Sequence, residues 1–227
     1  MRRVLLALLV LLAAPPGAAQ EFVRVERLLS DVEFHRLVAC AARPRRDCAK
    51  PLVRWPPERR AALTVGIVGG LDLLQGWKRA LVEAGLARAI GEVNGAGAGI
   101  RLVRADADPA IAVHVVAAHP GAPVAGTGVA ALDGRPLPLA LVAVRRDPDA
   151  PAYIAEADIA VSRFIRRREI GPVLLEEVVQ ALGLLTDVAG DAYRGSVFYE
   201  SGNSVPFLRG QDAAALRLHY PPQPPEG

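Results

Sequence analysis

A short segment, 176–187, gathers the side chains whose types and spacing could support chemistry. Two adjacent carboxylates, Glu176 and Glu177, are followed by Gln180 and Gly183 at i+4 and i+7 from the first. In an α-helix these spacings bring residues onto one face. A carboxylate pair can act as general acid and base, and oxygen atoms can also bind a hard cation.

A helix must position these groups, and the sequence predicts one from Val173 to about Leu184. Apolar residues surround most of its cylinder, which is typical of a buried helix. Because an unpaired buried carboxylate is costly, we expect the polar face to open into a solvated cleft or to meet compensating partners. The alternative is an ordinary exposed face on which Glu176 bonds to Gln180. Periodicity alone does not choose between them.

The string E-E-V-V-Q-A-L-G-L-L-T-D resembles the zinc-binding helix of the metzincin proteases, H-E-x-x-H-x-x-G-x-x-H/D. By this resemblance Glu176 stands where the first zinc-binding histidine would be. Gln180 stands at the second ligand position and Thr186 at the third. All three ligand positions have therefore changed.

The other positions of the motif are kept. The resemblance places Glu177 at the general base, Gly183 at the glycine where the chain turns, and Asp187 at the acidic residue after the third ligand. Further on, S-V-F at 196–198 resembles the S-I-M core of the methionine turn, and QDAAALRLHY resembles the closing helix. The whole pattern over 172–220 is similar to a proteobacterial exported family, domain of unknown function 2927, which tends to have Asn where this chain has Thr186.

The altered positions imply altered metal chemistry. A zincin holds zinc through two imidazoles one helical turn apart and a third ligand. Here the matching side chains offer only oxygen atoms, which suit calcium or magnesium better than zinc. Among the other histidines, His114 and His119 should face opposite sides of a strand, while His35 and His219 are isolated in the sequence. We therefore predict no catalytic zinc and assign no metal ligands.

Three functional hypotheses follow. The first is a non-catalytic module that binds a peptide or an envelope protein, because in metzincins the cleft binds an extended peptide against a sheet edge that can survive loss of the metal. The alternative is an unconventional hydrolase or peptidase that uses Glu177 with Glu176 or with an oxygen-ligated metal. Neighbouring helix positions point about 100° apart, which places this pair poorly for sharing a proton. In the third, the polar face is structural and function lies elsewhere.

The surrounding pattern predicts an α+β fold with a mixed β-sheet. The resemblance implies a metzincin-like (zincin) arrangement: a long N-terminal helix, a central site helix and a small C-terminal subdomain. We expect an N-terminal extension over 20–60, one domain over 61–220 and a Pro-rich tail over 221–227. The expected strands are 63–70, 100–105, 111–117, 136–147 and 153–162. The expected helices besides the site helix are 73–93, with a kink or break at Gly85, and 211–220.

The N-terminus predicts export. Residues 1–19 have the charged start, short apolar run and small-residue end of a signal peptide. In an exported chain the two cysteines, Cys40 and Cys48, favour a disulfide. Removing Arg2 and Arg3 lowers the formal net charge from +3 to +1, so no basic surface for nucleic acid is indicated. No later stretch is long and apolar enough to span a membrane, and we predict a periplasmic or secreted protein.

Overall fold

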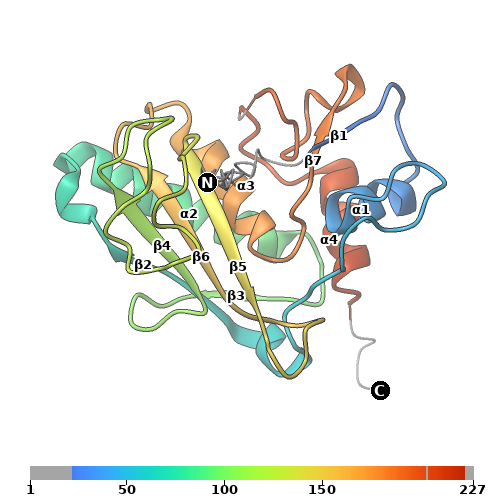
Figure 1. Cartoon of the computed structure of the whole chain (residues 1–227), viewed down its shortest axis with the longest axis horizontal. Helices are drawn as coiled ribbons and strands as arrows, with labels where there is room; N and C mark the ends of the chain where they lie inside the picture. Colours follow the sequence, from blue (N-terminus) through green and yellow to red (C-terminus); the bar gives the residue numbers. More distant parts are fainter. Residues whose placement is uncertain (1–21, 203, 223–227) are drawn as a thin grey trace, which may run out of the picture.

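A computed structural model of the chain describes residues 22–202 and 204–222 (Figure 1). It contains a five-stranded sheet flanked by two helices, and beside it a smaller group made of two short helices and a two-stranded ribbon. The predicted signal peptide, 1–19, lies outside the described residues. No helix of the described part is long and apolar enough to cross a membrane.

The sheet is mixed, which confirms the predicted α+β class. Its order is β3-β2-β4-β6-β5. The first four strands are parallel, while β5 runs antiparallel to β6 and forms one edge. The bounds are β2 Leu63–Gly69, β3 Leu102–Arg104, β4 Ile111–Val116, β5 Ala140–Arg146 and β6 Ile154–Ser162.

Two helices, α2 (Gly76–Gly95) and α3 (Ile170–Gln180), pack together in the main core. The expected break at Gly85 is wrong, because α2 runs through this position without interruption. A Cβ at Gly85 would lie 2.8 Å from Leu174 Cδ1 and 3.3 Å from Ile170 Cγ2. The glycine therefore allows α3 to approach α2 closely rather than bending the helix.

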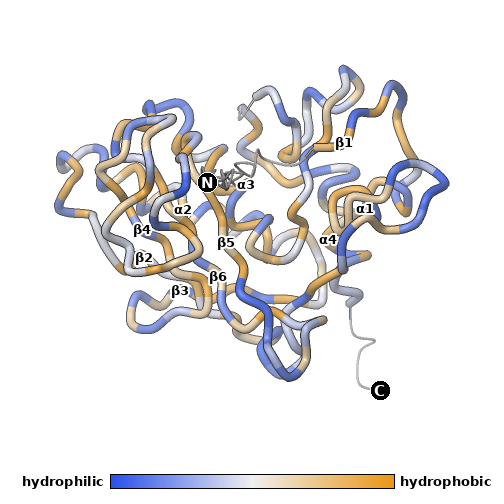
Figure 2. The backbone as a smooth tube through the Cα atoms, in the orientation of Figure 1, coloured by the Kyte–Doolittle hydropathy of each residue, from blue (hydrophilic) through white to orange (hydrophobic). Residues whose placement is uncertain are grey.

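The opposite face of the sheet is partly covered by the long connection between β4 and β5. Val124, Leu132 and Leu137 from this connection are fully buried and pack with Val116 and Ala160 in a second, smaller core. In Figure 2 hydrophobic residues run along β4 and β5, whereas the outermost loops are largely hydrophilic. The predicted long loop thus carries its own apolar contacts.

The N-terminal segment packs against the C-terminal part of the chain. Strand β1 (Phe22–Arg24) pairs in parallel with β7 (Asp187–Ala189), and α1 (Asp31–Cys40) lies against α4 (Gly210–His219). The ring of Phe34 stacks on that of Tyr193 at 5.0 Å between centroids. The predicted disulfide is confirmed, since Cys40 and Cys48 are bonded.

Candidate functional site

The helix α3 lies in the interior and is buried on nearly every side. Its carboxyl end is fixed by residues from distant parts of the chain. Trp55 Nε1 donates to the carbonyl of Ala181 at 3.0 Å, and the Tyr220 hydroxyl donates to the carbonyl of Leu182 at 2.6 Å. Because the last carbonyls of a helix lack partners within it, these two bonds supply them and hold the helix in place.

The predicted span of this helix was wrong at both ends, because α3 covers 170–180 rather than 173–184. Gly183 therefore does not share a helical face with Glu176. It lies in the turn after the helix with φ of +100°, and an added Cβ would be 2.2 Å from the carbonyl oxygen of Val53. Both the left-handed backbone and the close approach require glycine here.

The two adjacent glutamates are buried yet incompletely bonded. Glu176 is 4% exposed and Glu177 3%. The Oε2 atom of each has no hydrogen-bond partner among the described residues. Burial raises the pKa of Glu177 to about 8, with the nearby carboxyl of Asp187 adding to the effect. Burial, followed by the charges of Glu177, Asp187 and Glu200, raises the pKa of Glu176 well above its usual value. Glu177 is therefore mostly protonated at neutral pH.

Both glutamates open into a hollow of about 510 Å³, which we call the cleft. Its walls come from three separate parts of the chain: 120–121 with 138–140 at the start of β5, the helix α3, and 200–202 beyond β7. Burial also raises the pKa of Glu200, which lines the same cleft. The sequence-based expectation that this polar face meets a cleft therefore holds for Glu176 and Glu177.

The other predicted site residues do not reach the cleft. Gln180 Nε2 donates to Asp187 Oδ1 at 2.9 Å, and both residues are buried. Thr186 is fully buried, and its hydroxyl has no partner among the described residues. Glu176, Gln180 and Thr186 thus do not line one cavity together. Within 22–202 and 204–222, no group of three or more His, Cys, Asp or Glu side chains could hold a metal ion.

The S-V-F segment is held by a residue that sequence reasoning did not single out. Ser196 Oγ donates to Asp212 Oδ1 at 2.6 Å, and the backbone N–H of Val197 donates to Asp212 Oδ2 at 2.9 Å. Burial raises the pKa of Asp212 to about 6, while these two hydrogen bonds oppose the rise. Phe198 is fully buried and meets Phe34 edge to face. Asp212 therefore anchors this turn to α4.

His35 and His219, which are isolated in the sequence, meet in the fold. They form a buried pair with 3.2 Å between His35 Nε2 and His219 Nδ1. Since His219 Nε2 can only donate to the carbonyl of Val53, at 3.0 Å, its Nδ1 accepts from His35. The two histidines are 184 positions apart, so no local pattern in the sequence could indicate this contact. The pair supports the packing of α1 on α4.

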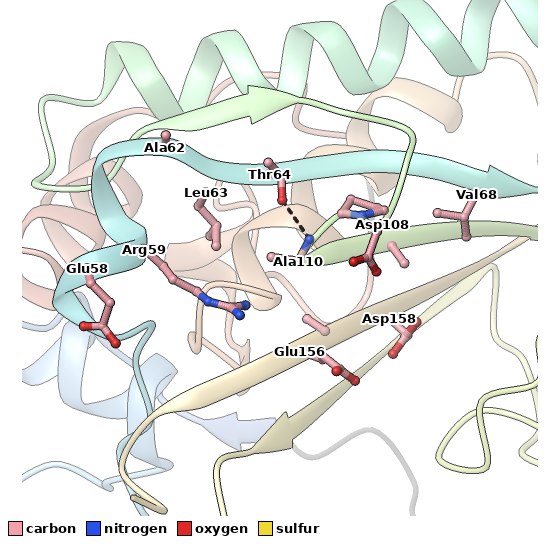
Figure 3. A pocket seen from close by; sticks show the side chains of 13 residues that line it. Glu58, Arg59, Ala62, Leu63, Thr64, Val68, Asp108, Ala110, Glu156 and Asp158 are labelled. Carbon is pink, nitrogen blue, oxygen red and sulfur yellow. Dashed lines mark hydrogen bonds between the residues drawn. The ribbon is translucent and has the colours of Figure 1, made fainter.

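A second hollow, of about 520 Å³, lies on the uncovered part of the sheet (Figure 3). Glu156 and Asp158 project toward it from β6. Each of these carboxylates already has a partner, because Arg145 Nε donates to Glu156 at 3.0 Å and His114 Nε2 lies 3.0 Å from Asp158 Oδ1. No described residue that lines this groove, which the sequence did not suggest, has a buried side-chain atom without a partner, whereas three residues of the cleft do.

Of the two hollows, the cleft is the stronger candidate site, because three of the glutamates that line it each have a buried carboxyl oxygen without a donor. Its chemistry suits a ligand that brings hydrogen-bond donors or positive charge. Comparison with known proteins adds no family assignment. No protein-family model matches this chain, and no curated protein matches it.

Proposed function

We propose that this protein is an exported, non-catalytic binding module on a metzincin-like scaffold, and that its cleft takes an extended peptide segment of a partner protein. The observation that carries the proposal is the position of the edge strand β5, whose first residue, Ala140, lines the cleft beside Glu176 and Glu177. An exposed sheet edge can accept an added strand from another chain.

The outer edge of β5 is open for such pairing. Ser162 N donates to Leu139 O. Because the bonded positions of an antiparallel pair alternate, the backbone groups of Ala140, Val142 and Val144 point away from β6. Among the described residues no strand pairs with this side of β5. A peptide running along β5 would therefore find free donors and acceptors and would enter the cleft at Ala140.

Several features support the scaffold and the absence of catalysis. The strand β2, the long helix α2, the mixed sheet, the buried helix α3 and the S-V-F turn occur in the order that the resemblance implies. At the positions of the zinc ligands, Gln180 is bonded to Asp187 and Thr186 is buried away from the cleft. The Cys40–Cys48 disulfide supports export, because disulfides persist in oxidising compartments.

The test is selection of peptides from a random displayed library on purified residues 20–227, with and without EDTA. We expect selected peptides to bind equally well in both conditions. The substitution Val142→Pro should weaken binding at least about tenfold, because it removes an outward N–H without removing a bond to β6. Val142→Ala, which keeps this N–H, is the matched control. Binding that survives Val142→Pro in a folded variant would refute docking along β5.

One observation favours a second candidate, an unconventional hydrolase. A protonated glutamic acid that lines a cleft and has one unbonded oxygen, as Glu177 does, can serve as a general acid. The measurement is hydrolysis of a fluorogenic peptide mixture by the wild type and by Glu177→Gln. Turnover that disappears in Glu177→Gln but persists in the exposed control Glu83→Gln would establish this function and overturn the non-catalytic one.

A further inference from the structure

Resting on that proposed function, we infer that the cleft selects peptides with a basic residue: a lysine or arginine side chain of a peptide on β5 enters the cleft and bonds to the carboxyl groups of Glu176 and Glu177, with Glu200 at the rim. This specifies the chemical class of the partner.

The cleft has a one-sided charge. Four glutamates line it, and no lysine or arginine does. The carboxylate of Glu169 already has a counter-charge and a hydrogen-bond donor. Arg166 Nη1 lies 3.8 Å from Glu169 Oε1, and the backbone N–H of Arg166 donates to Glu169 Oε2 at 3.0 Å. Glu176, Glu177 and Glu200 have no such partner among the described cations. The only ionisable side chains of the described residues that a ligand meets in the cleft are therefore acidic.

The buried oxygens lack donors as well as counter-charge. The Oε2 atoms of Glu176, Glu177 and Glu200 are all shielded from solvent and unbonded within the described chain. Leaving such an atom unsatisfied typically costs about 1–3 kcal/mol. A lysine ammonium brings three N–H donors and an arginine guanidinium five. Either group would supply both the missing hydrogen bonds and the missing charge.

A basic side chain fits this site better than a metal ion. A calcium ion needs several oxygens at about 2.3–2.6 Å around one point, and the described residues provide no group of three suitable side chains. Glu176 and Glu177 are adjacent on α3, so their side chains leave the helix about 100° apart. A branched cation with several donors can bridge oxygens that do not converge on one point.

The edge strand explains why the cation belongs to a peptide. Alternate side chains of a strand point to the same face of a sheet. A peptide paired with the outward groups of Ala140 and Val142 would direct every second side chain toward the face on which α3 packs. The side chain nearest Ala140 then lies over the cleft. We expect the preference for lysine or arginine at that single peptide position.

Binding of a cation should also release protons. Because Glu177 is mostly protonated at neutral pH, a bound ammonium or guanidinium would favour its ionised form. Asp187 also raises the pKa of Glu177, and the carboxyl of the adjacent Glu176 interacts with those of Glu177, Asp187 and Glu200. All of these groups are acidic. Titration calorimetry at pH 7 in two buffers of different ionisation enthalpy measures this release, which a neutral peptide would not cause.

The experiment uses residues 20–227 and peptides selected as above. We expect lysine or arginine to be enriched at one position, and its replacement by norleucine to weaken binding at least about tenfold, as for loss of a charge-assisted hydrogen bond. In Glu176→Gln and Glu177→Gln the ratio of the affinity for the basic peptide to that for the norleucine peptide should fall toward one. Glu169→Gln, which removes a carboxylate that already has a partner, and the exposed Glu83→Gln should retain it.

The outcomes separate this inference from the proposed function. Selected peptides that depend on Val142 but tolerate norleucine would overturn the basic preference and leave peptide binding along β5 standing. Stoichiometric calcium or manganese binding that Glu177→Gln abolishes, with no preference for basic peptides, would overturn it in favour of a metal site. Failure to select any peptide would remove the proposed function together with this inference.

Discussion

Replacing Glu177 with glutamine should stabilise the protein at neutral pH. The carboxyl of Glu177 is 3% exposed and must remain largely protonated in the folded chain, whereas it ionises freely in the unfolded chain. An amide of nearly the same shape has no proton to retain. The variant Glu177→Gln therefore removes a cost of folding without creating a cavity.

The size of the effect follows from the difference in pKa. The pKa of Glu177 rises from 4.5 to about 8 on folding. For an acid with a raised folded-state pKa, stability is fully present below pH 4.5 and declines as pH rises toward 8. Each pKa unit corresponds to about 1.36 kcal/mol, so the loss through this group reaches about 3 kcal/mol at pH 7. Since Glu177 also raises the pKa of Glu176, the substitution relieves that neighbour too.

Urea unfolding of the oxidised protein at pH 4.5, 6 and 7.5 measures this directly. The wild type and Glu177→Gln should have similar stability at pH 4.5, and the variant should gain about 3–4 kcal/mol by pH 7 to 7.5. Glu83→Gln, at an exposed position of α2, is the control and should follow the wild type. A Glu177→Gln variant with the same pH dependence as the wild type would refute the reasoning, because Glu177 would then be ionised and paired in the fold.

Three further predictions concern the structure around the site. Gly183→Ala should destabilise the protein by about 2 kcal/mol or more in thermal unfolding, because of its φ of +100° and the nearby Val53 carbonyl; Gly91→Ala on α2, where an added Cβ meets nothing within 4 Å, should instead stabilise by about 0.5–1 kcal/mol. Burial lowers the pKa of His35 to about 4, so stability should fall as pH drops from 6.5 toward 4, and His35→Gln should flatten that fall in urea unfolding. Replacing both cysteines with serine should cost about 2–3 kcal/mol in guanidinium unfolding, and reductant should then have no further effect.

Local patterns predicted the sheet better than the contacts around it. The runs that became β2, β4 and β6 are rich in β-branched residues, and the structure places strands within each. Strands β1 and β7 were missed because each has only three residues and exists through pairing with the other, which lies far along the chain. Gly85 was misinterpreted for a related reason. Its role depends on Leu174, which lies far along the chain, whereas the break was predicted because the apolar stripe of the helix slips at this position.

The candidate site was predicted in part. Hydrophobic residues around α3 indicated burial, and the cost of burying carboxyls predicted that the polar face meets either a cleft or compensating partners. In the structure Glu176 and Glu177 line a cleft. The same reasoning could not separate Glu177, which reaches the cleft, from Gln180, which bonds to Asp187. That difference depends on where the chain turns after the helix. The positions of Glu200 and of the β5 edge also depend on tertiary structure and leave no local pattern.

The energetics of the glutamate pair give the strongest reason to regard the cleft as a binding site. If Glu176 and Glu177 served only to hold the fold together, their oxygens should be bonded and their pKa values depressed, as expected for carboxylates that stabilise a native state. Instead one oxygen of each is unpartnered and both pKa values are raised. At neutral pH the pair therefore opposes folding. These carboxyl groups oppose folding, lie in a hollow and face no counter-charge, which is the arrangement expected of a binding site. A cation that enters beside the open edge of β5 would supply the missing hydrogen-bond donors and the missing positive charge.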